Sequence, residues 1–180
     1  MALRRRTIEL LQLQPGQIVL DVGAGTGLSY ALLLGAVGPT GRVLGFEQSP
    51  HMFALAEARV QREGWGNLWH TRVPAEKVQL PELADAVLFN FTHDILRTPQ
   101  AVDNIMRQVK SGGRVAVAGI QFFPWWTGPL NLLPWLMNRP YNARAADLWH
   151  PWDKLQGHCR DFKRSSVMWG MGYLASGSRR

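Results

Sequence analysis

The chain has 180 residues, 46% of them hydrophobic and 18% charged, so it can bury the core of one domain. This composition excludes a disordered chain, and no apolar run reaches the roughly 18 residues that a membrane-spanning helix needs. No apolar signal-peptide core follows the arginines of MALRRRTIELLQLQPG, so we expect a soluble, cytoplasmic protein. The single cysteine, Cys159, excludes a disulfide framework and a cysteine cluster, and we expect no metal site.

The charge of the chain is unevenly distributed. The net charge is +7, but five basic residues stand at what we interpret as ragged chain ends: Arg4, Arg5, Arg6, Arg179 and Arg180. Residues 1–112 carry 11 basic and 10 acidic side chains, whereas residues 113–180 carry 9 and 3. The nearly neutral first part argues against a nucleic-acid partner. The basic second part suits either an anionic substrate or a solvated surface.

The first two thirds of the chain alternate β-rich segments with helical patterns. The expected strands are residues 17–22 (QIVLDV), 42–47 (RVLGFE), 68–73, 84–91 (ADAVLFNF) and 114–121 (RVAVAGIQ). The expected helices cover residues 27–36, 50–63 after the N-cap signal Ser49-Pro50, and 98–110. This order predicts an α/β fold with a doubly wound, mostly parallel sheet and helices on both faces. Such sheets bind ligands at the carboxyl ends of their strands.

The last third of the chain is rich in tryptophan and proline. Residues 121–151 contain Trp125, Trp126, Trp135 and Trp149. A segment broken by proline and glycine suits a pocket wall, so we expect residues 122–150 to form an aromatic-rich lid insertion in a single domain, 1–180. Tryptophans near Arg139 and Arg144 also suit peripheral contact with a membrane. A short helix over 151–157 and two strands, 162–169 and 173–176, are expected to close the sheet edge.

The strongest chemical signal is the segment VLDVGAGTG, residues 19–27, which ends a strand and begins a helix. Glycines there permit a tight turn and a close approach of a ligand to the backbone. The dinucleotide fingerprint G-x-G-x-x-G needs a glycine at position 28, where this chain has Leu28. Asp21 would repel a pyrophosphate but attract an ammonium or sulfonium group. Glu47, twenty residues after Gly27, can accept both hydroxyls of a ribose.

These residues resemble the class I S-adenosylmethionine-dependent methyltransferases, and the resemblance runs from about Gln17 to Ser176. It implies a Rossmann-like, seven-stranded sheet whose last strand is antiparallel, with S-adenosyl-L-methionine as the cofactor. It also implies that the glycine turn passes under the methionine part and that the acid after the second strand holds the ribose. The cofactor residues expected on this basis are Asp21, Gly23, Ala24, Gly25, Gly27 and Glu47, with Gln48 beside the adenine.

The segment after the third strand departs from the family pattern. Many members carry an acid there that reaches the adenine amino group, whereas this chain has Val73-Pro74-Ala75-Glu76. Proline supplies neither the acid nor a backbone donor. Ala75 can offer its backbone N–H to the ring and Glu76 can reach the amino group, although Glu76 equally suits an exposed position on the next turn.

The fourth strand ends in Asn90-Phe91-Thr92-His93-Asp94, where the methyl acceptor is expected. Asn90 can bind the amino or carboxylate end of the cofactor. His93 titrates near neutral pH and is a candidate general base, and Asp94 can orient it or hold a cationic substrate. The alternative is that Thr92 or Asp94 caps a helical turn and that His93 only forms part of the wall.

A sulfonium is already an activated methyl donor, so the enzyme mainly has to align the acceptor and exclude water. We therefore expect methyl transfer to a small-molecule or lipid-like acceptor. A non-catalytic adenosine-binding module and a methyltransferase of RNA or protein are the alternatives. The Asn/Asp-Pro-Pro-aromatic signature of amine-methylating nucleic-acid enzymes is absent, since Asn90-Phe91-Thr92-His93 stands in its place.

Overall fold

The structure is a computed structural model that describes residues 2–123, 125–132, 135–136 and 149–180, with the side chains of residues 125–127 left out. Its strands are β1 Ile18–Val22, β2 Arg42–Glu47, β3 Leu68–Arg72, β4 Ala84–Asn90, β5 Val109–Ile120, β6 Cys159–Val167 and β7 Gly172–Arg179. The α-helices are α1 Ala2–Glu9, α2 Tyr30–Val37, α3 Pro50–Glu63, α4 His93–Leu96, α5 Pro99–Arg107 and α7 Asp153–Gln156. Two 3₁₀ segments, η1 Trp125–Asn131 and η4 Met168–Gly170, follow β5 and β6.

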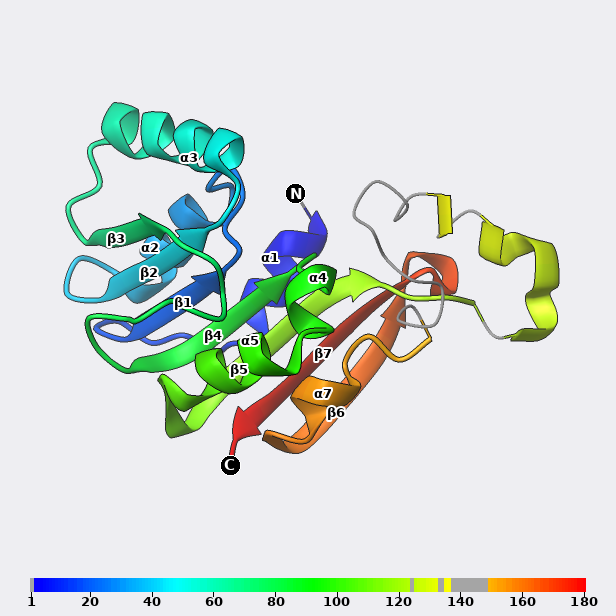
Figure 1. Cartoon of the computed structure of the whole chain (residues 1–180). Helices are drawn as coiled ribbons and strands as arrows, with labels where there is room; N and C mark the ends of the chain where they lie inside the picture. The colour runs from blue at the N-terminus through cyan, green and yellow to red at the C-terminus, as the bar shows by residue number, and fades with distance from the viewer. Residues whose placement is uncertain (1, 124, 133–134, 137–148) are drawn as a thin grey trace.

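The seven strands form one sheet in the order β3-β2-β1-β4-β5-β7-β6 (Figure 1). The first five strands are parallel, and β7 runs antiparallel to both β5 and β6. The chain moves outward from β1 in one direction to β3 and then returns to the other side at β4. The sheet therefore has its switch point between β1 and β4, and their carboxyl ends open a crevice there. The expected doubly wound, Rossmann-like fold is confirmed.

The sheet separates two hydrophobic cores. Alternate residues of β4 point to opposite faces, so Ala86 and Leu88 join one core while Val87 and Phe89 join the other. Helices α1, α2 and α3 cover the first face, and α4, α5 and α7 lie on the second (Figure 1). Because both faces are covered, β4 is almost entirely buried, which explains its continuous apolar sequence.

Local sequence signals set the boundaries of α3. The Ser49 side chain accepts a hydrogen bond from the backbone N–H of Met52 at 3.4 Å, Pro50 occupies the first turn, and Gly64 ends the helix with a left-handed φ of 67°. Helix α2 begins later than expected, at Tyr30. Gly27 has a φ of 72°, so the backbone cannot enter the helix there.

Strand β5 begins earlier than expected, at Val109 instead of residue 114, so the preceding helix ends at Arg107. Val109 pairs with Ala84, and the register then shifts before Arg114 pairs with Ala86. Gly112, with a φ of 78°, thus belongs to a bulge inside the strand. The closing hairpin is also longer than expected, because Cys159 pairs with Arg179 at its open end.

The described residues near both ends of the chain, from Ala2 and up to Arg180, pack against the rest of the fold, which corrects the expectation of ragged ends. Helix α1 lies against the sheet through Ile8 and Thr7, and Arg4 donates a hydrogen bond to the Ser29 hydroxyl. Arg179 lies in β7 and donates to the Val109 carbonyl, and the Arg180 Nε donates to the Cys159 carbonyl at 3.1 Å.

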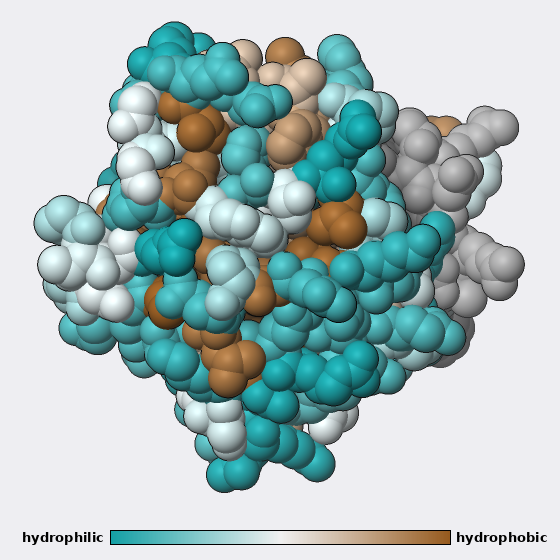
Figure 2. Space-filling model, turned by 60° about the vertical axis from the view of Figure 1, so that its left-hand side comes forward, coloured by the Kyte–Doolittle hydropathy of each residue, from teal (hydrophilic) through white to brown (hydrophobic). Residues whose placement is uncertain are grey.

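Most of the expected lid lies outside the described residues, including Arg139, Arg144 and the side chains of Trp125 and Trp126. In the part that is described, η1 is the next element after β5, which ends at Ile120, and the Phe123 N–H donates to Asn131 Oδ1 at 2.7 Å. Among the described residues, none of the helices combines the length and the apolar composition of a membrane span. Figure 2 shows a face on which hydrophobic residues lie in small groups between hydrophilic ones.

Candidate cofactor and active site

The turn between β1 and α2 has glycine at three positions whose backbone conformation strongly favours it. Gly23, Gly25 and Gly27 have φ values of 57°, 59° and 72°, a region that side chains with a Cβ rarely adopt. A Cβ on Gly23 would lie 2.9 Å from the Thr92 side chain, whereas a Cβ on Gly25 would meet nothing within 4 Å. Gly25 therefore borders open space, and its missing side chain leaves room for a ligand.

Glu47 holds this turn in place from the end of β2. Its Oε2 accepts a hydrogen bond from the Gly25 N–H at 2.9 Å, and its Oε1 accepts from the Ser49 N–H at 2.8 Å. A carboxylate offers about four acceptor positions, so two of them are available for ligand hydroxyls. The two backbone bonds fix the direction of the carboxylate before any ligand binds.

Asp21 is the penultimate residue of β1 and is only 1% exposed. Burial raises the pKa of its carboxyl group to about 7, while the charge of Arg4 and a hydrogen bond with Ser29 act in the opposite direction. Its Oδ2 is buried and has no hydrogen-bond partner among the described residues. An unpartnered buried carboxylate oxygen is costly, and a cationic ligand group would satisfy it.

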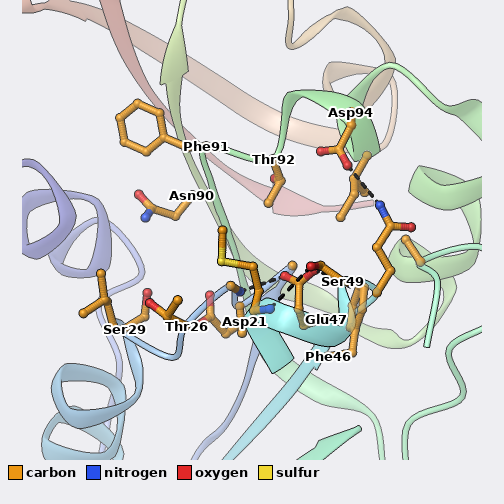
Figure 3. Close-up of a pocket in the computed structure, with 18 of the residues that line it drawn as sticks. Asp21, Thr26, Ser29, Phe46, Glu47, Ser49, Asn90, Phe91, Thr92 and Asp94 are labelled. Atoms are coloured by element: carbon orange, nitrogen blue, oxygen red, sulfur yellow. Dashed lines mark hydrogen bonds between the residues drawn. The ribbon is translucent and has the colours of Figure 1, made fainter. Parts of the chain in front are cut away.

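These groups surround a cavity of about 520 Å³ at the carboxyl ends of β1, β2 and β4. Figure 3 shows Asp21 beside Thr26 and Ser29 on one side, Glu47 and Ser49 on the other, and Asn90 and Thr92 across the cavity. The volume lies in the range of small-molecule and cofactor sites. The cavity therefore brings together most of the expected cofactor residues: Asp21, Gly23, Ala24, Gly25, Glu47, Gln48, Ala75 and Asn90, with Asp94 beside them. Gly27 does not line the cavity and packs against Tyr30 instead.

The segment after β4 forms the wall opposite the glycine turn. Asn90 Oδ1 and Thr92 Oγ1 are buried and have no hydrogen-bond partner in the described part of the chain. Between them, Phe91 is 43% exposed and has a φ of 60°, an unusual value for a bulky residue. Strained backbone of this kind concentrates at functional sites, and here it directs polar groups toward the cavity.

His93 does not line the cavity, which argues against the general base expected from the sequence. Its Nε2 accepts a hydrogen bond from the Ile120 N–H at 3.1 Å, and its ring packs against Gly119 of β5. Burial lowers the pKa of His93 to about 4, with Asp94 acting in the opposite direction. The ring is therefore neutral near pH 7, and the nitrogen that could accept a proton is already engaged.

Asp94 and Gln48 are hydrogen-bonded to each other at the mouth of the cavity, whereas the sequence suggested a separate role for each. The Gln48 Nε2 donates to Asp94 Oδ2 at 3.3 Å, so the carboxylate of Asp94 has a partner other than His93. Ala75 is buried and lines the cavity. Glu76 is exposed on the turn after β3 and is not among the lining residues, so its expected contact with the adenine lacks structural support.

Several residues that line the cavity were not expected from the sequence, and the polar or aromatic ones among them include Arg4, Ser29, Phe91 and Thr92. Ser29 lies two residues after the glycine turn, and Phe91 and Thr92 lie between two predicted residues, so proximity to the motifs could have identified them. Arg4 reaches the cavity only because α1 packs against the sheet, and no local pattern in the sequence reports that contact.

The model of the protein-L-isoaspartate(D-aspartate) O-methyltransferase family matches residues 2–121. The chain belongs to this family. The membership confirms the resemblance to S-adenosylmethionine-dependent methyltransferases, whose cofactor is S-adenosyl-L-methionine. The matched part contains the glycine turn, Glu47 and the β4–α4 segment. It ends before the tryptophan-rich segment begins.

Individual relatives differ in the acceptors that their names specify. The chain is 32% identical over 143 residues to a ubiquinone/menaquinone biosynthesis C-methyltransferase UbiE of Pseudomonas putida, covering 78% of this chain and 52% of the relative. It is 31% identical over 112 residues to the protein-L-isoaspartate O-methyltransferase of Aeropyrum pernix, covering 62% and 42%. The chain thus spans about half the length of the curated relatives it matches.

Solved structures share the fold. A SAM-dependent methyltransferase from Aquifex aeolicus superposes with a TM-score of 0.73 at 19% identity, covering 98% of this chain and 89% of that one. The N-methyltransferase NodS from Bradyrhizobium japonicum, in complex with S-adenosyl-L-homocysteine, gives a TM-score of 0.66 at 16% identity, covering 98% and 86%. At these identities the likeness concerns the fold alone.

Proposed function

We propose that this chain binds S-adenosyl-L-methionine and transfers its methyl group to a small-molecule or lipid-like acceptor. The observation that carries the proposal is Asp21, a buried carboxylate with an unpartnered oxygen beside a glycine turn. Such a group disfavours phosphate and favours a ligand with positive charge. The family membership agrees with this chemistry.

The residues of the cavity suit each part of this cofactor. Asp21 would accept hydrogen bonds from the ammonium end, and Glu47 has two acceptor positions left for the ribose hydroxyls. Gly25 leaves the space that the cofactor needs. Ala75 and Gln48 line the remaining wall and would adjoin the adenine, with the Ala75 N–H as a donor to the ring.

The bound cofactor supplies an electrophilic methyl group. The tasks of the protein are then to orient the acceptor and to exclude water. His93 does not line the cavity and its Nε2 is engaged by the Ile120 N–H, so of the two bases that the sequence suggested only Asp94, which also accepts from Gln48, lines the cavity. Phe91 would form the apolar wall against which the acceptor is aligned.

A small or lipid-like acceptor is supported by the apolar rim of the cavity. Leu28, Met52 and Phe91 line it and remain 38%, 39% and 43% exposed, which is a substantial apolar area at its mouth. The UbiE relative, whose name specifies a quinone pathway, points in the same direction. We propose that residues 122–150 complete the acceptor side as part of the single domain 1–180, because they follow β5 at the carboxyl edge of the sheet.

The test has a binding step and an acceptor step. S-adenosyl-L-homocysteine and NAD are titrated into the protein by calorimetry, with Gly25→Val as the matched control that should bind neither. Labelled S-adenosyl-L-methionine is then incubated with separate lipid, small-molecule, protein and RNA fractions of the source cells. Label in the lipid or small-molecule fraction is expected. Label in the protein or RNA fraction would overturn the acceptor class, and binding without transfer to any fraction would indicate an adenosine-binding module.

A further inference from the structure

Arg4 belongs to the buried face of α1 although it is a charged residue. Positions 4, 7, 8 and 11 follow one another at helical spacing, and Thr7, Ile8 and Leu11 are all buried. Arginine is rarely placed on such a face unless it has a partner there. The side chain of Arg4 reaches the lining of the cofactor cavity, where its Nη1 donates to the Ser29 hydroxyl at 2.6 Å.

Ser29 connects this guanidinium to Asp21. The Ser29 side chain is 1% exposed and accepts from Arg4. Its hydroxyl and the charge of Arg4 both act to lower the pKa of Asp21. A guanidinium has five N–H donors, and the bond to Ser29 uses one of them. On the other side of Ser29, the Asp21 Oδ2 is buried and has no partner within the described part of the chain. A cation and an anion therefore face the same end of the cavity, separated by one hydroxyl.

We propose that Arg4 is a specificity-determining residue that binds the carboxylate of the cofactor's amino-acid end while Asp21 binds its ammonium group. This inference rests on the proposed function and deepens it. The two side chains together are complementary to a zwitterion, which has one carboxylate and one ammonium on the same carbon. An adenine nucleotide would place phosphate charge against the buried Asp21, so the pair also selects against nucleotides.

Because Arg4 lies on α1 and reaches the cavity, a ligand bound in the cavity would change the stability of α1. The chain leaves α1 through Leu10, whose carbonyl accepts from the Arg114 Nη2 at 3.1 Å, and this contact fastens the end of the segment to β5. Burial lowers the pKa of Arg4, and the negative charge of Asp21 raises it. Asp21 therefore offsets only part of the cost of burying the guanidinium charge before a ligand binds. A ligand carboxylate would complete its hydrogen bonding and stabilise α1 in its docked position.

The experiment compares two ligands that differ only at the amino-acid end. S-adenosyl-L-homocysteine has the zwitterion, and 5′-methylthioadenosine lacks it. Arg4→Met removes the charge and keeps most of the side-chain volume, and Arg6→Met on the exposed face of α1 is the matched control. We expect Arg4→Met to weaken S-adenosyl-L-homocysteine about 10- to 100-fold and to leave 5′-methylthioadenosine within twofold. The Arg6→Met variant should bind both as the native protein does.

Two results would overturn the assignment. An equal loss for both ligands would mean that Arg4 only supports the fold, and unchanged binding of S-adenosyl-L-homocysteine would mean that Arg4 does not contact the ligand. Failure of the native protein to bind S-adenosyl-L-homocysteine would instead contradict the proposed function itself. Amide hydrogen exchange gives a second readout, because α1 should exchange more slowly with S-adenosyl-L-homocysteine bound in the native protein but not in Arg4→Met. Equal exchange with and without the ligand in the native protein would refute the coupling.

Discussion

Replacing Asp21 by asparagine should stabilise the protein and weaken its ligand binding. The two effects have one cause, because the buried carboxylate is costly to ionise until a cation reaches it. Asparagine has nearly the same shape and can accept the Ser29 hydrogen bond, but it carries no charge. The comparison therefore isolates the charge of Asp21 from the packing around it.

The magnitude follows from the pKa of Asp21, which rises from 3.8 to about 7 in the folded protein. Above pH 3.8 the unfolded chain releases this proton more readily than the folded one, so stability is lost as the pH rises toward 7. A gap of about three pH units corresponds to about 4 kcal/mol at pH 8, since each unit is worth 1.36 kcal/mol. By the same relation the loss is only about 1–2 kcal/mol at pH 5, so the advantage of the asparagine variant should grow by about 2–3 kcal/mol between pH 5 and pH 8.

Urea unfolding of the native protein and of Asp21→Asn at pH 5 and pH 8 measures this difference. Asp161→Asn, on the exposed surface of β6, serves as the control and should show no such growth. Titration with S-adenosyl-L-homocysteine should show a loss of at least about tenfold in affinity for Asp21→Asn. A stability difference that is the same at both pH values would refute the reasoning, because the charge of Asp21 would then not be the cause.

Three other substitutions test the remaining parts of the site. Glu47→Ala should lower the affinity for S-adenosyl-L-homocysteine at least about tenfold by calorimetry, because the ribose acceptor and the anchor of Gly25 are both lost; unchanged affinity would remove Glu47 from the cofactor site. Gly25→Val should abolish binding, since a branched residue at a φ of 59° is strained and fills the cavity; retained binding would contradict the role of the turn. His93→Ala should change kcat less than about tenfold and cost about 1–3 kcal/mol in urea unfolding, because the buried Ile120 N–H loses its acceptor; a 10²-fold fall in kcat would restore His93 as a base.

The fold could be predicted from the sequence where local signals act alone. The boundaries of β2 and α3 agree with the expectation residue by residue, because glycine and proline punctuate them and Ser49 caps the helix. The glycine turn was identifiable for a similar reason, since its left-handed backbone leaves few alternatives to glycine. The bulge at Gly112 was not identifiable, because a glycine pair after a helix usually marks a loop.

The sequence predicted which strand ends form the candidate site, but it did not predict the direction of every side chain there. Asp21, Glu47 and Asn90 stand at strand ends, and the parallel topology brings those ends together. His93 and Asp94 follow the same strand, but the first turn of α4 directs the histidine to β5 and the aspartate to Gln48. A sequence places residues along an element, and the direction of a side chain depends on what packs against that element.

Helix α2 and strand β1 have opposite effects on the charge of the ligand that the site can bind. The N-terminus of a helix after a glycine turn attracts anions, and dinucleotide-binding proteins use it in that way. Here α2 begins only at Tyr30, three residues after Gly27, and the negative charge of Asp21 stands at the end of β1 before the turn. Arg4 then restores positive charge at one edge of the cavity without neutralising the free Asp21 oxygen. Together with Leu28 in place of the third fingerprint glycine, the buried carboxylate and the arginine make this turn less suited to a phosphate and are the basis for our proposal that it binds a zwitterion.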